Sequence, residues 1–436
     1  MQAGAILQAC LDLLHELKEE KKPADELINQ YLRKRRYIGS SDRHQITDLF
    51  YLIIRTWGHL TWWVHHHKNE NSSPKERLYL IACLMLNKKW PLKKVLSLFN
   101  DQKFCPPSLT QQEINFAQHL EGQSLDHPKQ DQPTQFETPI WIFKHFKKLY
   151  PTSYKKELQS LSQEAPFDLR VNILKTSREK LFDMLTKQGL SIQYCPLSPW
   201  GLRTNKKFPL AQMDIFKQGL VEVQDEGSQL IAWLVDAQTN MKVLDFCAGA
   251  GGKTLALAAT MHNKGQVIAT DISTKRINRA PQRLRRAGIH NVQCKALKQN
   301  DPWIKRHHNF FDRVLIDVPC SGSGTWRRNP EAKWRLTEET LQNLQKLQQQ
   351  ILEKAHMLVK TGGRLIYSTC SLFKDENETI LNDFLTHHKN FSVIPIPKIW
   401  AKLTKNPCPT HEDFLQLTPA QHHTDGFFIG ILEKNC

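Results

Sequence analysis

The feature that most restricts the fold is an alternation of short apolar runs with helix-like segments, which begins near Gly219. Short apolar runs bounded by turn residues are typical of buried strands, and apolar residues three and four apart are typical of helices. Strands that alternate with helices predict a mostly parallel sheet, and therefore an α/β fold for residues 219–436. The expected strands are Met241–Asp245, Gln266–Thr270, a short one near Val292, Arg313–Ile316 and Arg364–Tyr367, and the expected helices are Leu255–Thr260, a basic helix up to Gly288, and Glu338–Leu358.

Two loops that follow expected strands carry a cysteine. Asp317-Val-Pro-Cys-Ser-Gly-Ser-Gly324 follows one strand, and Ser368-Thr-Cys-Ser371 follows another. Ligands of open α/β sheets bind beyond the carboxyl ends of the strands. Either cysteine alone is best interpreted as a small buried hydrophobic residue, the usual state of a free cysteine. Two cysteines at the ends of neighbouring strands instead indicate a functional pair, Cys320 and Cys370.

A third loop predicts a nucleoside-binding site. Gly249-Ala-Gly-Gly252 lies between a strand and a helix, where glycine lets the backbone approach a ligand closely. Asp271 ends the next strand, where a carboxylate accepts hydrogen bonds from ribose hydroxyls. Lys253-Thr254 resembles the end of a phosphate loop, but the glycine spacing of an ATP-binding loop is not met. A nucleoside cofactor without phosphates, such as S-adenosylmethionine, therefore fits better than NAD or ATP.

Two adjacent cysteines suit one reaction on a nucleic-acid base. C5 of cytosine is not nucleophilic enough to take a methyl group directly, but a thiolate that adds to C6 makes C5 enamine-like. The Asp317 carboxyl group and the Pro319 carbonyl would hold the N3/N4 edge of the base. The second cysteine would assist proton transfer or elimination. The residues alone do not decide whether Cys320 or Cys370 attacks.

Charge and composition narrow the partners. The 436 residues carry a net charge of +17, which favours a polyanionic partner, with a merely soluble basic surface as the alternative. No run approaches the roughly 20 apolar residues needed to cross a bilayer, and the first residues do not resemble a secretory signal. The ten cysteines show no metal-like spacing. We expect a cytoplasmic monomer that binds neither a membrane nor a metal.

A chain of this length predicts two or three domains. Residues 1–130 show helical periodicity, with Ser72-Ser73-Pro74 expected to open one helix. The polar segment Gly122–Pro133 marks a boundary, residues 136–218 read as a small α+β insert, and residues 219–436 form the catalytic domain. Basic residues in the first two domains are candidates for RNA contacts, with a solvated helix end as the alternative for the first group: Arg33–Arg36, and Lys175, Arg178, Arg203, Lys206 and Lys207.

Two further basic stretches lie in the catalytic domain. The segment Trp326–Arg335 directly follows the Cys320 loop and would stack on flipped bases. The other stretch is the basic helix, which would contact phosphates or simply be solvated; its cations are Lys275, Arg276, Arg279, Arg283, Arg285 and Arg286.

Together these motifs resemble those of one family, the RNA cytosine-5 methyltransferases. The helical front resembles the NusB-type RNA-binding domain of bacterial enzymes that modify 16S rRNA, most closely at Arg36-Tyr-Ile-Gly-Ser-Ser-Asp-Arg43. The resemblance implies a Rossmann-like S-adenosylmethionine-dependent methyltransferase domain, preceded by an all-α NusB-like domain and a small ferredoxin-like α+β insert. It also implies methyl transfer to C5 of a cytosine in small-subunit (16S) ribosomal RNA. The matching stretches are Pro166-Phe-Asp-Leu-Arg-Val-Asn172, Val223-Gln-Asp-Glu-Gly-Ser-Gln-Leu230, Asp245-Phe-Cys-Ala-Gly-Ala-Gly-Gly-Lys-Thr254, Asp317–Gly324 and Ser368–Ser371.

The resemblance implies a role for each matching residue. Cys370 would be the nucleophile and Cys320 the cysteine that helps to release the product. Asp317 and Pro319 would contact the target base, and Lys253 would support the active site. The cofactor would be held at its methionine part by Cys247, Ala248, Gly249, Ala250, Gly251 and Gly252 and at its ribose by Asp271, with Lys253, Arg276 and Asp317 as further contacts.

One position departs from the family pattern. Ala296 stands where the family usually has an aspartate near the adenine, and Asp301 is the nearest substitute. This predicts weaker cofactor binding than in relatives that have the acid. Three alternatives stay open: the same chemistry on tRNA, a non-catalytic RNA-binding or antitermination-like protein with a decayed enzyme domain, and an amino-methyltransferase. The last needs Asp/Asn-Pro-Pro-aromatic where this chain has Asp317-Val-Pro-Cys320, and the intact Lys253 and Cys370 argue against the second.

Overall fold

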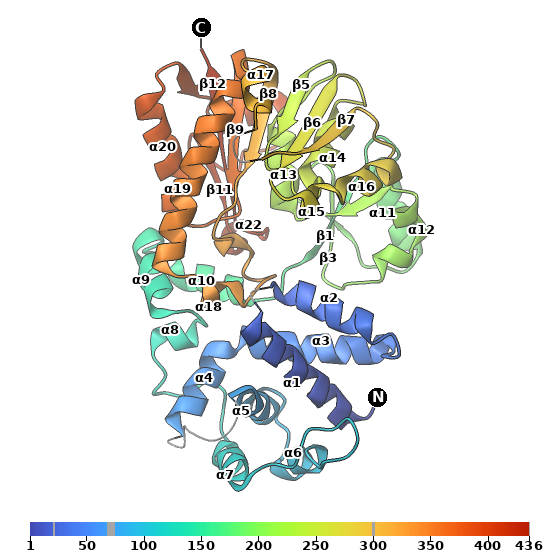
Figure 1. Ribbon diagram of the computed structural model, residues 1–436, viewed down its shortest axis with the longest axis vertical. Coiled ribbons are helices and arrows are strands. Elements are labelled where there is room, and N and C mark those ends of the chain that lie inside the picture. Colours follow the sequence, from blue (N-terminus) through green and yellow to red (C-terminus); the bar gives the residue numbers. More distant parts are fainter. Residues whose placement is uncertain (21, 68–74, 299–300, 436) are drawn as a thin grey trace. The chain divides into compact units, whose positions relative to one another are not determined.

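The computed structural model describes residues 1–20, 22–67, 75–298 and 301–435. The chain forms two compact units (Figure 1), one made of Met1–Gln163 with Trp326–Leu336 and the other of Glu164–Thr325 with Thr337–Cys436. The helix start expected at Ser72-Ser73-Pro74 lies outside the described residues.

The first unit is built of helices. Ile6, Cys10 and Leu13 are buried on one face of α1, as their spacing predicts, and they pack with the apolar residues of α3, α4 and α5. The helices are α1 (Ala3–Glu19), α2 (Ala24–Lys34), α3 (Ser40–Arg55), α4 (Trp57–His66), α5 (Lys75–Ala82), the π-helix η1 (Cys83–Asn87), α6 (Leu92–Leu98), α7 (Gln111–Leu120), α8 (Gln132–Gln135), α9 (Ile140–Leu149), α10 (Tyr154–Ser162) and α18 (Ala332–Arg335).

The segment Trp326–Leu336, from much later in the chain, completes this unit. Trp326 is 1% exposed, and its ring lies 6.1 Å from that of Phe146 on α9. The Arg335 guanidinium donates a hydrogen bond of 2.6 Å to the carbonyl of Leu17, near the end of α1, where carbonyls have no helical partner. The expectation that Trp326 stacks on RNA bases is therefore wrong, because the helical unit encloses its indole.

The second unit begins with an antiparallel sheet in the order β2-β3-β1-β4. Leu169 of β1 and Leu181 of α11 are fully buried in its core. The strand β2 is short: Gln193 and Tyr194 pair with Arg203 and Leu202 of β3. The elements are β1 (Phe167–Val171), α11 (Arg178–Lys187), β2 (Gln193–Tyr194), β3 (Gly201–Thr204), η2 (Leu210–Gln212), α12 (Asp214–Lys217) and β4 (Val221–Val223).

The rest of this unit is a larger sheet in the order β10-β12-β9-β8-β5-β6-β7, with β11 paired to β12. Strands β9, β8, β5, β6 and β7 are parallel, and β12 is antiparallel to β9. The expected α/β fold with a mostly parallel sheet is confirmed. Its strands are β5 (Lys242–Asp245), β6 (Gln266–Asp271), β7 (Val292–Ala296), β8 (Phe311–Asp317), β9 (Val359–Thr369), β10 (Phe391–Val393), β11 (Leu415–Leu417) and β12 (Phe427–Lys434).

Helices cover both faces of this sheet. Val243 and Leu315 belong to one apolar core with α13, α14 and α21, whereas Leu244 and Val314 belong to a second core with α17, α19 and α20. Successive strand residues point to opposite faces, so both faces are buried. The helical segments are α13 (Glu226–Leu234), α14 (Gly252–Thr260), α15 (Thr274–Ile277), α16 (Ala280–Ala287), α17 (Trp303–Arg306), η3 (Ser323–Thr325), α19 (Glu338–Ala355), η4 (His356–Leu358), η5 (Lys374–Glu376), α20 (Glu378–His387), α21 (Ile396–Leu403) and α22 (Pro419–His422).

The basic helix expected up to Gly288 is in fact two helices, α15 and α16. Pro281 stands in the first turn of α16, and the preceding helix ends at Ile277. A proline ring collides with the carbonyl four residues earlier, which explains the break. Arg283 and Arg286 of α16 both pair with the buried Glu222 carboxylate, so this charge is already partly neutralised within the protein.

Candidate active site

The register of the sheet brings the cysteine loops together. Asp317 at the end of β8 lies opposite Ser368 of β9, so the loops that follow the two strands leave the same edge of the sheet. The Sγ atoms of Cys320 and Cys370 are 3.4 Å apart. The hydrogen bond to Cys370, together with burial, raises the pKa of Cys320 well above its ordinary value.

Asp317 forms an ion pair beside the cysteines, with a buried lysine and a half-buried carboxylate. Lys253 Nζ lies 2.6 Å from Asp317 Oδ2, and the Ser368 hydroxyl donates a 3.2 Å hydrogen bond to Oδ1. Burial lowers the pKa of Lys253, but the Asp317 carboxylate outweighs this effect and raises it above its ordinary value. The lysine is thus a fixed cation. The Pro319 carbonyl accepts a hydrogen bond of 2.9 Å from Gln348 Nε2. A carbonyl oxygen has a second lone pair, which can accept from another donor.

The glycine loop runs from the end of β5 into α14. Gly249 and Gly251 have positive φ angles of 56° and 78°, a region that glycine adopts without strain. A Cβ atom at Gly249 would meet nothing within 4 Å, so the loop has an open side on which a cofactor fits. Two guanidinium groups hold the loop carbonyls: Arg170 of β1 donates to Gly252 at 2.7 Å and Arg283 to Ala250 at 2.8 Å.

The other expected cofactor residues lie at the ends of β6 and β7. Asp271 is buried, and its carboxylate accepts hydrogen bonds from the N–H groups of Gly249 at 2.8 Å and Ser273 at 2.7 Å. Ala296 lies opposite Asp271 in the sheet. The Asp301 carboxylate accepts a hydrogen bond of 2.9 Å from the N–H of Trp303, the first residue of α17. The Arg276 side chain is exposed on α15.

The buried carboxyl group of Asp245, at the end of β5, is expected to make the free energy of unfolding depend on pH. Burial raises its pKa to about 6, with Asp317 contributing repulsion, and its Oδ1 accepts no hydrogen bond among the described residues. A carboxyl group whose folded-state pKa lies above its unfolded value stabilises the fold at low pH and loses this stabilisation as the pH rises from about 4 to about 6, by up to about 3 kcal/mol. We expect Asp245→Asn to remove this loss, measured as urea unfolding free energy between pH 4 and pH 7.

A matched control is available for this titration. Asp312 pairs with Lys360, and although burial raises its pKa, the ion pair brings it below the ordinary value. In the wild-type protein Asp312 therefore adds stability as the pH rises. Asp312→Asn should lack this gain, so its unfolding free energy should fall further below the wild-type value as the pH rises, the opposite sign to Asp245→Asn. An unchanged pH profile in Asp245→Asn would contradict the interpretation.

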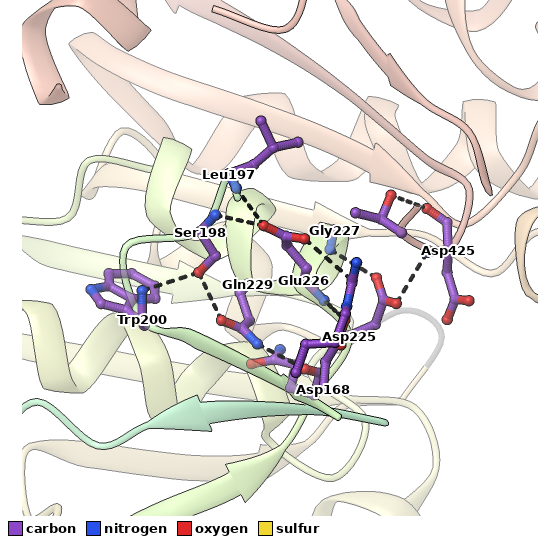
Figure 2. A network of polar contacts seen from close by, with 12 residues as sticks. Asp168, Leu197, Ser198, Trp200, Asp225, Glu226, Gly227, Gln229 and Asp425 are labelled. Carbon is purple, nitrogen blue, oxygen red and sulfur yellow. Dashed lines mark hydrogen bonds and ion pairs between the residues drawn. The ribbon is translucent and has the colours of Figure 1, made fainter. Parts of the chain in front are cut away.

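The sequence motifs at 166–172 and 223–230 meet in one buried network (Figure 2). Arg203 of β3 donates to both oxygens of Asp168 at 2.6 and 2.7 Å and reaches Glu226 at 3.2 Å. Glu226 also accepts from the N–H groups of Leu197 and Ser198 at 2.6 and 2.8 Å. The network joins the small sheet to the first turn of α13. The expectation that Arg203 lines an RNA path is wrong, because two buried carboxylates hold its guanidinium.

Three residues around the cysteines were not predicted from the sequence: Gly426, Glu376 and Gln348. The Gly324 N–H donates to the Cys370 carbonyl at 2.9 Å, and its own carbonyl accepts from the Gly426 N–H at 2.8 Å. Glu376 and Gln348 are fully buried beside both loops. No local pattern marks them, since an acid just before α20 is a common helix start and Gln348 lies in the polar-looking α19.

Two groups of described side chains have the spacing of metal ligands. Within the described ranges, one such group consists of Asp168, Cys195 and Glu226. The Arg203 guanidinium pairs with both of its carboxylates, in the position that a metal ion would take. A second group, Glu353, His356 and His388, lies at the end of α19. No helix in the described part of the chain is long and apolar enough to cross a membrane.

Comparisons with known proteins agree on one family. Residues 232–433 match the family described as 16S rRNA methyltransferase RsmB/F, and residues 138–211 match the ferredoxin-like domain of RsmF/B-like methyltransferases. The "Probable ribosomal RNA small subunit methyltransferase B" of Synechocystis sp. is 34% identical over 315 residues, which are 71% of this chain and 70% of that protein. Its counterpart in Bacillus subtilis is 32% identical over 316 residues, 71% and 69% of the two chains.

Solved structures show the same fold. The crystal structure of PH0851 superposes with a TM-score of 0.81 and 25% identity, covering 100% of this chain and 99% of that one. The structure of NSun6 from Pyrococcus horikoshii with SFG has a TM-score of 0.60 at 20% identity, covering 68% and 98%.

The sheet order and the glycine loop after β5 define a Rossmann-like methyltransferase that uses S-adenosylmethionine. With these relatives, the chain belongs to the RsmB/F family of 16S rRNA methyltransferases.

Proposed function

We propose that this protein transfers a methyl group from S-adenosylmethionine to C5 of a cytosine in 16S rRNA, through a covalent bond between Cys370 and C6 of the base. The observation that carries the proposal is the 3.4 Å separation of the two thiols at the carboxyl edge of the sheet, beside the Lys253–Asp317 ion pair. A cysteine that served only as a small buried apolar residue would need neither a second sulfur atom nor an ion pair beside it. Two sulfur atoms that reach one base supply both a nucleophile and a group for proton transfer.

The two sulfur atoms have different roles in this mechanism. Cys370 adds to C6 as a thiolate, forming the S–C6 bond and moving the electron pair toward C5. The cofactor supplies the methyl group that C5 takes up. The proton on C5 then passes to the Cys320 sulfur, which must first give up its own proton to act as the base. The S–C6 bond breaks, and the C5–C6 double bond returns with Cys370 as the leaving group. This assignment follows the resemblance to the RNA cytosine-5 methyltransferases, in whose pattern the Ser368–Ser371 motif carries the nucleophile and the Asp317–Gly324 motif the cysteine that helps to release the product.

Asp317 and Pro319 would recognise the base. The amino group of cytosine would donate a hydrogen bond to an Asp317 carboxyl oxygen or to the second lone pair of the Pro319 carbonyl. Lys253 holds the Asp317 side chain in place through the 2.6 Å contact. Exclusion of water by the bound base would strengthen each of these interactions.

Residues of the glycine loop would hold the cofactor. The open side of Gly249 admits it closely, and Asp271 is fixed by the Gly249 and Ser273 N–H groups with lone pairs left for ribose hydroxyls. Ala296, opposite Asp271, adds no carboxylate near the adenine, which supports the expected weaker cofactor affinity.

The choice of 16S rRNA over tRNA is tested with the wild-type protein. Labelled S-adenosylmethionine is offered with 16S rRNA, 23S rRNA and tRNA, and product cytosines are mapped by bisulfite sequencing. We expect label in 16S rRNA alone, at a cytosine that becomes resistant to bisulfite. The names of the relatives, which are small-subunit rRNA methyltransferases, support this substrate. Label confined to tRNA would support the alternative instead.

A further inference from the structure

A buried carboxylate outside the expected motifs connects the two cysteine loops. Glu376 is fully buried just before α20. Its Oε1 accepts from the Ser321 N–H at 2.8 Å and from Gln348 Nε2 at 2.9 Å. Its Oε2 accepts from the hydroxyls of Ser321 and Ser371, both at 2.5 Å. These donors saturate the acceptor sites of an ionised carboxylate, which has about four lone pairs for hydrogen bonds.

The donors are the immediate neighbours of the two cysteines. Ser321 follows Cys320 and Ser371 follows Cys370. One carboxylate oxygen therefore bridges the two loops directly, and Ser323 Oγ adds contacts of 3.2 and 3.1 Å to the same two hydroxyls.

The two loops depend on Glu376 to different extents. Beyond Glu376, the residue after Cys370 is fixed by the hydroxyl of Thr369, which accepts from the Ser371 N–H at 3.0 Å, and by Asn377, which donates to the Ser371 carbonyl at 3.0 Å. The residue after Cys320 instead places both its N–H and its hydroxyl on Glu376.

Gln348 links Glu376 to Pro319, one of the two residues proposed to bind the base. Its Nε2 donates both to Glu376 Oε1 and to the Pro319 carbonyl, at 2.9 Å each. The residues on either side of Cys320 are thus tied to one buried pair on α19 and η5, and the pair lies outside every stretch that resembles the family motifs.

We propose that Glu376 is a positioning residue that holds Cys320 at the distance from Cys370 required for product release, with Gln348 as its partner. This inference rests on the proposed two-cysteine mechanism. Loss of the carboxylate would free the Cys320 loop more than the Cys370 loop, so the second step should slow more than the first. A misplacement of about 1 Å is enough to reduce a catalytic step roughly a hundredfold.

The test compares the covalent RNA adduct with the methylated product in Glu376→Ala. Adduct is measured as RNA-bound protein that survives denaturation, and product as labelled methyl in free RNA. We expect the adduct-to-product ratio to rise about tenfold or more over wild type, with an unchanged Kd for the cofactor. A purely structural loss would lower the active fraction and leave this ratio constant, which would overturn the proposal.

Two further variants keep the result interpretable. Glu378→Gln alters a half-buried carboxyl group two residues away, which makes no hydrogen bond to either cysteine loop in the described structure, and should leave the ratio at the wild-type value. If Glu376→Ala does not fold, Gln348→Leu removes the contacts to Pro319 and Glu376 without a charge change and is expected to raise the ratio by a smaller factor.

Cys320→Ala, run in parallel, separates this inference from the proposed function. An adduct in Cys320→Ala together with a wild-type ratio in both Glu376→Ala and Gln348→Leu would overturn the role of Glu376 alone. No adduct in any variant would overturn the two-cysteine mechanism itself.

Discussion

Methyl transfer to 16S rRNA is expected to fall by about four orders of magnitude or more when Cys370 is replaced by alanine. Without the S–C6 bond, C5 of cytosine lacks the electron density to take up a methyl group. The same reaction with Cys320→Ala should stop after methyl transfer and leave a denaturation-resistant RNA adduct, because the group next to the Cys370 sulfur is gone. Single-turnover transfer of labelled methyl, followed by denaturing gel electrophoresis, measures both effects.

A third cysteine provides the control. Cys408 is free and partly exposed, in the segment after α21. Cys408→Ala should transfer at the wild-type rate without trapped adduct. An adduct formed by Cys370→Ala, and none by Cys320→Ala, would reverse the assignment of nucleophile and release cysteine.

Stability is expected to fall by about 3–5 kcal/mol when Arg203 is replaced by methionine. The change leaves two buried carboxylates, Asp168 and Glu226, without their counter-ion; their side chains are 0% exposed and that of Arg203 is 11% exposed. Burial already raises the pKa of Glu226, so the two acids would take up protons or separate. Urea unfolding at pH 7 measures the loss, which should shrink as the pH is lowered and the carboxylates are protonated.

An exposed ion pair of similar length is the control for this change. Lys207 Nζ lies 2.7 Å from Glu164, but both side chains are about two-thirds exposed, at 64% and 67%. Solvent screens such a pair, so Lys207→Met should leave the unfolding free energy nearly unchanged. Equal losses in Lys207→Met and Arg203→Met would mean that burial of the Asp168 network does not matter.

The sequence predicted that the two cysteine loops lie together, and the structure confirms this, because the signals of the two loops are local. A strand that ends in a polar, glycine-bearing turn is visible in a short window, and parallel strands present such turns at one edge. Cys320, Cys370 and the Gly249–Gly252 loop could therefore be assigned to that edge without knowledge of the register. Helix ends were less accurate, as the break before Pro281 shows.

Charged residues were the least predictable class. Arg203 was expected on an RNA path and is instead an internal counter-ion, and Arg283 holds a glycine-loop carbonyl. A basic side chain looks the same in sequence whether it faces a phosphate or a buried carboxylate. Which of the two it meets depends on contacts across 35 residues for Arg203 and Asp168, and such pairing leaves no periodic pattern.

The sequence by itself determined the α/β class, the edge of the sheet to which the cysteine loops belong and the residues proposed to perform the chemistry. Each of these follows from side-chain type and short-range periodicity. Only the tertiary structure decided that Trp326–Leu336 belongs to the helical unit and that Glu376 bridges the two cysteine loops. These features arise from contacts between residues far apart in the chain, Ser321 and Glu376 being 55 positions apart. Their energy comes from excluding water around paired polar groups, a property of the packed fold and not of any one segment.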